Sequence, residues 1–489
     1  MAARLPHSHL SRTPARLRMI ALHSAELFLI PLRTRMPFRY GIATLTALPH
    51  AVLRLTFEID GVVQPGLAAD SLPPKWFTKD PARALDDEVA EMQRVLRAAV
   101  AHARPIRAAT PWAFWRELHA AQAAWATAEK LPPLLAHFGT SFVERALLDA
   151  FCRARRTTFA AALRANLLGI DLGALHPALA GTAPGDWLPA TPAATVWARH
   201  TIGLADPLDA GEIAADERLD DGLPQALDAC IRFYGLRHFK IKINGEPARD
   251  RARLARMAEI FAAECGGEFA FSLDGNESWR DAAAFVAYAR ELFARDELRA
   301  LWPRLLFIEQ PWHREVALTP AVGAALRGWP ERPPIIIDES DAELGSVSAA
   351  LALGYAGASH KNCKGVFKGV ANACLLAARR ARGEPAWLSG EDLVNVGPVA
   401  LTQDLAVQTA LGVTTVERNG HHYFAGWSQF PAAWQAHAFA HHGDLFTRHA
   451  AGWPRLDVRG GRLALGSVNA AAFGAAGELD FSSLSAEPV

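Results

Sequence analysis

The chain has 489 residues, which is enough for two domains with a large core. Its 51 Lys and Arg residues balance 51 Asp and Glu residues, and this zero net charge argues against a nucleic-acid partner. No apolar run is long enough to span a membrane. The five cysteines lack CxxC or disulfide-framework spacing, which is typical of reduced thiols in a cytoplasmic enzyme.

The N-terminal part of the chain divides into a tail and a first domain. Residues 1–18 are basic and lack an apolar signal-peptide core, so we expect a disordered tail. Residues 19–190 should form the first domain, with two strands around a polar-aromatic loop over residues 36–41. The Asp60-Gly61 pair then predicts a tight hairpin turn. Amphipathic helices are expected over residues 81–165.

Residues 191–430 repeat a pattern of short apolar strand, loop and helix. The strands are predicted to begin at residues 195, 238, 268, 305, 334, 356, 386 and 413. Eight such parallel strands close a barrel, so the sequence predicts an α/β protein with a (β/α)8 TIM-like barrel. Residues 431–489 are expected to return to the first domain, with a small hairpin that pairs residues 455–458 with residues 462–465.

The second predicted strand carries two lysines, Lys240 and Lys242. Alternate residues of a strand face the same side, so both side chains should project into the region that the barrel encloses. Two buried ammonium groups need acidic partners nearby, or one of them must lose its proton. We therefore expect Lys240 to lower the pKa of Lys242.

Acidic partners follow at the ends of the next three strands. Asp274, Glu309 and Asp338 each end an apolar run, and Lys361 ends the sixth strand. Because catalytic residues of such barrels lie at the carboxyl ends of the strands, these side chains should meet at one rim. Three carboxylates without a thiolate or histidine cluster favour Mg²⁺, with Mn²⁺ as a possible substitute.

This set of residues predicts proton abstraction next to a carboxylate. A divalent cation would stabilise the negative charge that a bound carboxylate substrate gains when its α-proton leaves. Lys242 and Lys361 lie on opposite sides of the predicted barrel, so each can serve one face of the substrate carbon as acid or base. The predicted partner is therefore a small-molecule carboxylate.

Five motifs occur in a fixed order along the barrel. They are Lys240-Ile241-Lys242, Asp274-Gly275-Asn276, Glu309-Gln310-Pro311, Asp338-Glu339-Ser340 and Lys361-Asn362-Cys363-Lys364-Gly365. Together they resemble the enolase superfamily, in the mandelate racemase/muconate-lactonizing-enzyme family, whose lysine bases work with Mg²⁺. The resemblance implies that the N-terminal region is an α+β capping domain whose loops close over the barrel, and that the protein is a homo-oligomer.

The resemblance also implies further site residues. Asn276 and Glu339 would support the metal ligands, and Glu417, at the end of the eighth strand, would contact the substrate. Arg39, Tyr40 and Lys75 lie on the two loops expected to cap the barrel, so they are candidates for binding the far end of the substrate.

The sequence alone leaves several functions open. The lysine pair favours a racemase or epimerase, whereas a cycloisomerase or an acid-sugar dehydratase would use the same enediolate. A Schiff-base aldolase using Lys361 and a non-catalytic binding protein are further alternatives. The pairs His421-His422 and His441-His442 are interpreted as solvated side chains, because neither has a carboxylate at ligand spacing.

Overall fold

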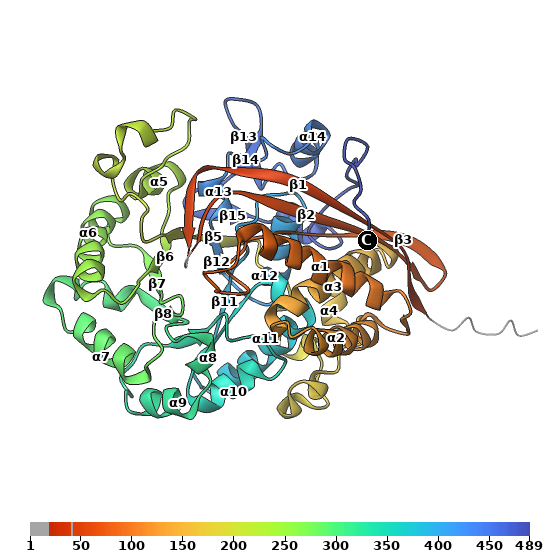
Figure 1. The fold of residues 1–489 in the computed structure, drawn as a ribbon, viewed down its shortest axis with the longest axis horizontal. Helices are drawn as coiled ribbons and strands as arrows, with labels where there is room; N and C mark the ends of the chain where they lie inside the picture. Colours follow the sequence, from red (N-terminus) through yellow and green to blue (C-terminus); the bar gives the residue numbers. More distant parts are fainter. Residues whose placement is uncertain (1–18, 41–42) are drawn as a thin grey trace, which may run out of the picture.

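The structure, a computed structural model, describes residues 19–40 and 43–489, without the side chains of Tyr40 and Ala43. The predicted N-terminal tail, residues 1–18, lies outside the described residues. The described chain forms a barrel and a capping domain that packs against it (Figure 1). Within these ranges, every helix is too short or too polar to cross a lipid bilayer.

The capping domain begins with a four-stranded antiparallel sheet in the order β3-β2-β1-β4. The strands are β1 (Ile20–Tyr40), β2 (Ala43–Ile59), β3 (Val62–Ser71) and β4 (Arg107–Ala108). Asp60 and Gly61 both have positive φ, 51° and 84°, as a type I′ turn between β2 and β3 requires. The predicted turn is therefore present.

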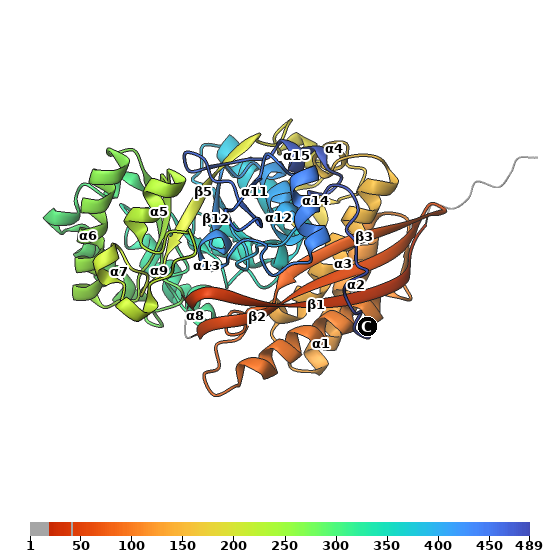
Figure 2. The same cartoon turned by 90° about the horizontal axis from the view of Figure 1, so that it is seen from above.

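The segment predicted to be a polar-aromatic loop is instead the end of β1. Phe38 pairs with Leu45 and Arg39 pairs with Thr44, after an irregularity in the register that begins at Arg33. Cross-strand pairing thus continues β1 as far as Tyr40. Figures 1 and 2 show the result, a long β1-β2 arm that reaches from the capping domain towards the barrel.

The capping domain also contains four helices: α1 (Leu85–Ala103), α2 (Pro111–Ala128), α3 (Pro133–Ala154) and α4 (Phe159–Arg164). Helix α3 is buried along nearly its whole length, because it lies between the sheet and the other helices. Gly66 of β3 permits this close approach, since a Cβ atom there would lie 2.0 Å from the carbonyl oxygen of Ala146. The helices predicted over residues 81–165 are present.

The second domain is a closed barrel of eight parallel strands, in which β12 pairs with β5. The strands are β5 (Thr195–Ile202), β6 (His238–Lys242), β7 (Ala270–Asp274), β8 (Leu305–Glu309), β9 (Ile335–Ile337), β10 (Gly357–His360), β11 (Trp387–Gly390) and β12 (Thr415–Arg418). Every predicted strand start lies within two residues of the observed one. The predicted (β/α)8 barrel with an α+β capping domain is confirmed.

Helices surround the barrel and continue beyond its last strand. They are α5 (Leu227–Tyr234), α6 (Pro247–Cys265), α7 (Ala282–Phe293), α8 (Arg314–Ala317), α9 (Pro320–Arg327), α10 (Ser346–Leu353), α11 (Val366–Ala381), α12 (Ala400–Ala410), α13 (Gly420–Tyr423), α14 (Ala432–His441) and α15 (Gly466–Ala470). Short 3-10 turns connect several elements, and η1 (Leu172–Ala174), η2 (Pro177–Leu179) and η3 (Pro184–Asp186) occupy the link between the two domains.

The C-terminal segment first packs on the barrel and then reaches the cap. Strand β13 (Phe446–Arg448) pairs with β14 (Pro454–Leu456), whereas β15 (Arg462–Ala464) pairs with barrel strand β5. The predicted hairpin between residues 455–458 and 462–465 forms only at its turn, where Arg459 and Arg462 exchange two backbone hydrogen bonds of 3.0 Å around Gly460-Gly461. Beyond the turn the two strands separate, because β14 pairs with β13 and β15 pairs with β5. Near the end of the chain, the Glu487 amide donates to the Leu27 carbonyl oxygen at 2.7 Å.

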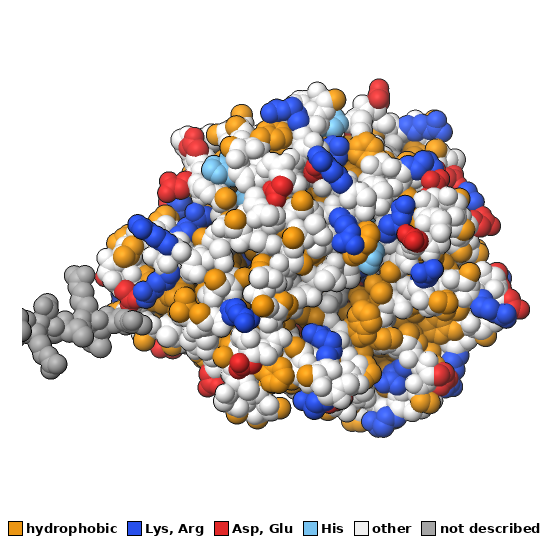
Figure 3. All heavy atoms as spheres, turned by 180° about the vertical axis from the view of Figure 1, so that it is seen from behind, with side chains coloured by type: hydrophobic (Ala, Val, Ile, Leu, Met, Phe, Trp, Pro, Cys, Tyr) orange, Lys and Arg blue, Asp and Glu red, His pale blue; other side chains and the backbone are white. Residues whose placement is uncertain are grey.

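The surface agrees with the balanced composition. On the face shown in Figure 3, Lys and Arg side chains are interspersed with Asp and Glu side chains rather than gathered in one basic tract.

Candidate active site

Lys240 and Lys242 project from β6 into the ring of carboxylates at the carboxyl ends of the barrel strands. Lys242 Nζ donates to Asp274 Oδ2 at 2.5 Å. Lys240 Nζ lies within 3.1 Å of four carboxylates, those of Asp274, Glu309, Glu391 and Glu417. The alternation of β6 therefore places both lysines on the enclosed side, as predicted.

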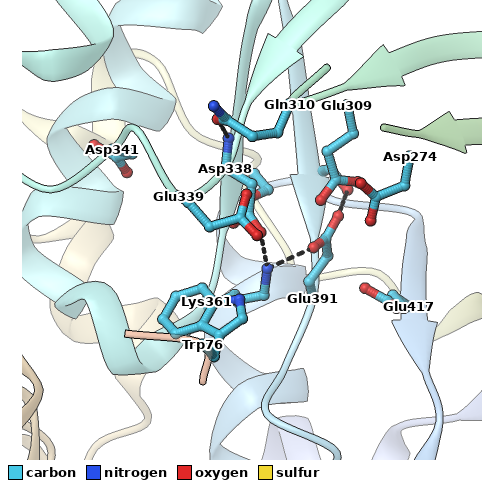
Figure 4. Close-up of polar contacts among 12 residues, drawn as sticks. Trp76, Asp274, Glu309, Gln310, Asp338, Glu339, Asp341, Lys361, Glu391 and Glu417 are labelled. Carbon is cyan, nitrogen blue, oxygen red and sulfur yellow. Dashed lines mark hydrogen bonds and ion pairs between the residues drawn. The ribbon is translucent and has the colours of Figure 1, made fainter. Parts of the chain in front are cut away.

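Lys361 approaches from the opposite side, because β10 lies four strands from β6 in the barrel. Its Nζ donates to Asp338 Oδ2 at 2.5 Å and to Glu391 Oε2 at 2.8 Å. The ring of Trp76, from the capping domain, lies 5.1 Å from this ammonium group. Figure 4 shows Lys361 between these carboxylates, with the Trp76 ring beside it.

Glu391 is a central residue of the site that was not predicted from the sequence. It follows β11 and is completely buried. Its Oε2 accepts from Lys240 and Lys361, and its Oε1 accepts from Arg199 at 3.2 Å and Ser389 Oγ at 2.8 Å. The sequence does contain a signal for Glu391. It directly follows a barrel strand, and the other acids were predicted from that position.

The carboxylates form a set that fits a hard divalent cation. One oxygen each from Glu309, Asp338 and Glu391 lies within 4.8 Å of the other two. In an octahedral Mg²⁺ site with bonds of about 2.1 Å, opposite ligand oxygens are about 4.2 Å apart. Glu309 Oε2 is buried and receives no hydrogen bond from the described residues. A buried, unpartnered carboxylate oxygen is where a cation would compensate the lost solvation.

Asp274, the third predicted ligand, is placed differently from the other two. Its Oδ2 is held by Lys240 and Lys242, and its Oδ1 accepts from the Asn276 amide at 2.7 Å. The oxygen set above contains Glu391 in its place. The structure thus brings all the predicted acids to one rim, but the ion pairs with the two lysines hold Asp274 beside the candidate metal site.

Two amide side chains orient the acids. Asn276 Nδ2 donates to Glu339 Oε1 at 3.3 Å, which links the two residues predicted to support the ligands. Gln310 Oε1 accepts from the Asp338 amide at 2.7 Å (Figure 4). Burial, together with nearby acids, raises the pKa of Glu339 to about 7. These contacts fix the backbone next to Asp274 and Asp338.

The protein groups alone keep the lysines protonated. Burial lowers the pKa of Lys242, but the Asp274 carboxylate and other groups raise it more, so the net shift is upwards. Lys240 does lower the pKa of Lys242, as expected, but this effect is outweighed. The pKa of Lys361 is also raised, because Asp338 and Glu391 outweigh burial. Positive charge placed among these carboxylates would oppose both upward shifts.

A small cavity opens onto these groups. It is lined on the barrel side by Lys240, Lys242, Asp274, Asn276, Asp338, Lys361 and Glu417, and on the cap side by Phe38, Arg39, Pro73 and Trp76. The two lysines on opposite strands therefore face one shared space.

The predicted cap residues divide into two groups. Arg39 lines the cavity, whereas the side chain of Tyr40 lies outside the described residues. Lys75 does not line the cavity; its Nζ donates to Glu88 Oε1 at 2.7 Å and to two backbone carbonyl oxygens. Lys75 is buried within the cap, and its neighbour Trp76 reaches the site instead.

This division predicts opposite effects for two substitutions. Arg39→Ala should raise KM for the substrate with little change in the free energy of unfolding, because Arg39 is exposed in the cavity wall. Lys75→Ala should destabilise the protein by about 3–5 kcal/mol, because it leaves the buried Glu88 carboxylate unpaired. Urea unfolding measures the free energy of unfolding of each variant, and steady-state kinetics measure its KM. A change in KM for Lys75→Ala in folded protein, without one for Arg39→Ala, would contradict the assignment.

The cap loop that carries Trp76 is fastened to the barrel by Arg314. The Arg314 guanidinium donates to the carbonyl oxygens of Trp76 and Phe77, both at 2.9 Å, and forms an ion pair with Glu277. Lys79 of the same loop also pairs with Glu277, at 2.6 Å. These contacts hold the Trp76 ring against Lys361 in the closed arrangement seen here.

Comparisons with known proteins agree on the architecture. No family model and no curated protein matches the chain. Among solved structures, a mandelate racemase/muconate lactonizing protein from Herpetosiphon aurantiacus aligns with 18% identity over 93% of this chain and 98% of its own, with a TM-score of 0.57. A muconate lactonizing enzyme from Pseudomonas fluorescens, complexed with muconolactone, aligns with 18% identity over 94% and 97%, with a TM-score of 0.55.

A third structure, an enolase from Bradyrhizobium complexed with magnesium and mandelic acid, aligns with 18% identity over 91% of this chain and 93% of its own, with a TM-score of 0.53. Each alignment spans both the capping domain and the barrel, since it covers more than nine-tenths of the chain. The chain therefore has the two-domain fold of the mandelate racemase/muconate lactonizing enzymes of the enolase superfamily.

Proposed function

We propose that this protein is an Mg²⁺-dependent enzyme that removes the proton α to the carboxylate of a small molecule, through an enediolate intermediate. The observation that carries the proposal is the pair Lys242 and Lys361, which face one cavity from opposite sides of the barrel. Between them lie the carboxylates that suit a divalent cation. The fold shared with mandelate racemase and muconate lactonizing enzymes supports the same reaction class.

Each residue has a definite role in this chemistry. Glu309, Asp338 and Glu391 would hold Mg²⁺, with Asp274 beside them, and the bound ion would supply positive charge to stabilise the enediolate. Lys361 and Lys242 take and return the proton on opposite faces of the α-carbon.

Around these groups, Lys240 holds four of the carboxylates in place, and Trp76 covers Lys361 and limits the access of water to it. A substrate carboxylate would enter the cavity between the two lysines.

Two acid/base groups on opposite faces favour racemisation or epimerisation. Cycloisomerisation and acid-sugar dehydration share the enediolate and remain the alternatives within this class. The Schiff-base alternative is weaker, because it gives no role to the carboxylates Glu309, Asp338 and Glu391, which suit a divalent cation.

The proposal is tested by isotope exchange. The purified protein is incubated in D₂O with a library of carboxylic acids, and loss of the α-proton is followed by NMR. We expect exchange with Mg²⁺ and none after treatment with a chelator. Glu309→Gln should weaken Mg²⁺ binding by at least about 10-fold, because it removes a charge from the cation site. Glu315→Gln, which alters a surface ion pair with Arg280, is the matched control.

Two results would overturn the proposal. One is α-proton exchange that continues unchanged in the chelator-treated protein. The other is Mg²⁺ binding without exchange of any acid in a broad library, which would favour the non-catalytic alternative.

A further inference from the structure

A second group of metal-binding side chains lies outside the carboxylate site. His200 on β5, Cys230 on α5 and His422 on α13 each offer one ligand atom, and these three atoms lie within 4.8 Å of one another. On β5, Arg199 and Thr201 contact Glu391 and Glu417 inside the barrel, so His200 between them faces the outer side. Figures 1 and 2 show α13 beside this part of the barrel.

These residues are core groups rather than surface groups. Cys230 is completely buried, and His200 and His422 are 3% and 2% exposed. His421, the neighbour of His422, is also buried, with 8% exposed. The expectation that the His421-His422 pair is solvated is therefore wrong. Helix α13 turns both rings inwards against β5 and α5.

The distances suit tetrahedral coordination. Cys230 Sγ lies 3.6 Å from His422 Nδ1. Two ligands of one tetrahedral Zn²⁺, with a Zn–S bond of about 2.3 Å and a Zn–N bond of about 2.1 Å, lie about 3.6 Å apart. His421 Nε2 lies 3.1 Å from His200 Nδ1, so a third imidazole adjoins the three groups. Thiolate sulfur and imidazole nitrogen are both Zn²⁺ ligands.

One further observation points to a missing partner. His421 Nδ1 is buried and has no hydrogen-bond partner among the described residues, although its Nε2 lies next to His200. Buried ring nitrogens normally have a partner. The cluster therefore includes one buried imidazole nitrogen that its own hydrogen bonds do not use.

We propose that His200, Cys230 and His422 bind one Zn²⁺ ion, in a buried site that is independent of the catalytic carboxylates. Binding forms a Zn–S bond to Cys230 and releases the thiol proton to solvent. The histidines bind through neutral ring nitrogens.

The location explains what the ion would do. It would join three segments far apart in the chain, at residues 200, 230 and 421–422. Arg35 of capping strand β1 donates to the His422 carbonyl oxygen at 3.1 Å, and α13 follows the strand that carries Glu417. The ion would therefore stabilise the wall of the catalytic cavity and its contact with the cap.

The test is cobalt spectroscopy on the full-length protein. The chelator-treated wild type receives one equivalent of Co²⁺ in buffer with excess Mg²⁺, which occupies the carboxylates. We expect a thiolate-to-cobalt charge-transfer band in the near ultraviolet and tetrahedral d–d bands in the visible. The protein as purified should contain one zinc per chain by mass spectrometry.

A cysteine variant assigns the ligand. Cys230→Ser should lose the charge-transfer band and the bound zinc. Cys265→Ser should keep both, because the Cys265 sulfur is also buried but contacts the Leu236 carbonyl oxygen instead. Absence of the band in the wild type, or its retention in Cys230→Ser, overturns the proposal.

The cobalt spectrum of the wild type tests the proposal even if Cys230→Ser fails to fold. It is also independent of α-proton exchange, so loss of the proposed function would leave it standing.

Discussion

Replacing Lys361 by alanine is expected to slow α-proton exchange by at least about 10²-fold, the contribution typical of a general acid or base. Lys361 Nζ lies in the cavity wall between Asp338 and Glu391, and no other ammonium group lines that side of the cavity within the described residues. Exchange into substrate of each configuration is measured separately by NMR in D₂O with saturating Mg²⁺.

Lys242→Ala should affect the opposite face of the substrate carbon. For a racemase, Lys361→Ala therefore abolishes exchange from one enantiomer and Lys242→Ala from the other. Lys130→Ala removes an exposed lysine far from the cavity lining and is the matched control. Far-ultraviolet circular dichroism checks that each variant is folded. Undiminished exchange in both cavity variants would contradict the acid/base assignment.

Replacing Glu391 by alanine is expected to lower the free energy of unfolding by about 3–5 kcal/mol. Its carboxylate is completely buried and accepts from Lys240, Lys361 and Arg199. Alanine would remove the negative charge that these three buried cations share. A buried charge without a partner lowers the free energy of unfolding, because it has lost its hydration. Urea unfolding of the metal-free protein, followed by fluorescence, gives the difference.

A surface glutamate provides the comparison. Glu384 also contacts two cations, Arg379 and Arg382, but it lies at the surface, where water solvates both partners. Glu384→Ala should therefore change stability far less than Glu391→Ala. Equal stability of the two variants would show that Glu391 does not organise the buried charges.

The barrel could be predicted because its signals are local. Each strand, loop and helix repeats within one short stretch of sequence, and the starts of all eight strands were located to within two residues. The Asp60-Gly61 turn is local as well, because both residues adopt positive φ within the turn itself. The same applies to Lys240 and Lys242, whose common direction follows from the alternation of one strand.

The details of the site could not be predicted, because they depend on contacts between distant residues. Lys240 and Glu391 are 151 positions apart, and Trp76 reaches Lys361 from another domain. Lys75 lies in the expected cap loop, yet its side chain points into the cap, where it donates to Glu88 and to two backbone carbonyl oxygens. Loop position alone does not determine which of two neighbouring side chains faces the cavity.

The amino-acid sequence by itself thus determined the barrel and the rim that carries the two lysines and the acids, since strand periodicity and chain order suffice for these. The capping domain followed from the resemblance to the enolase superfamily. Only the tertiary structure decided that Glu391 joins Glu309 and Asp338 while two lysines hold Asp274, and that His421 and His422 are buried beside Cys230. Burial and charge pairing are set by the side chains that surround a residue, and folding brings those together from distant segments.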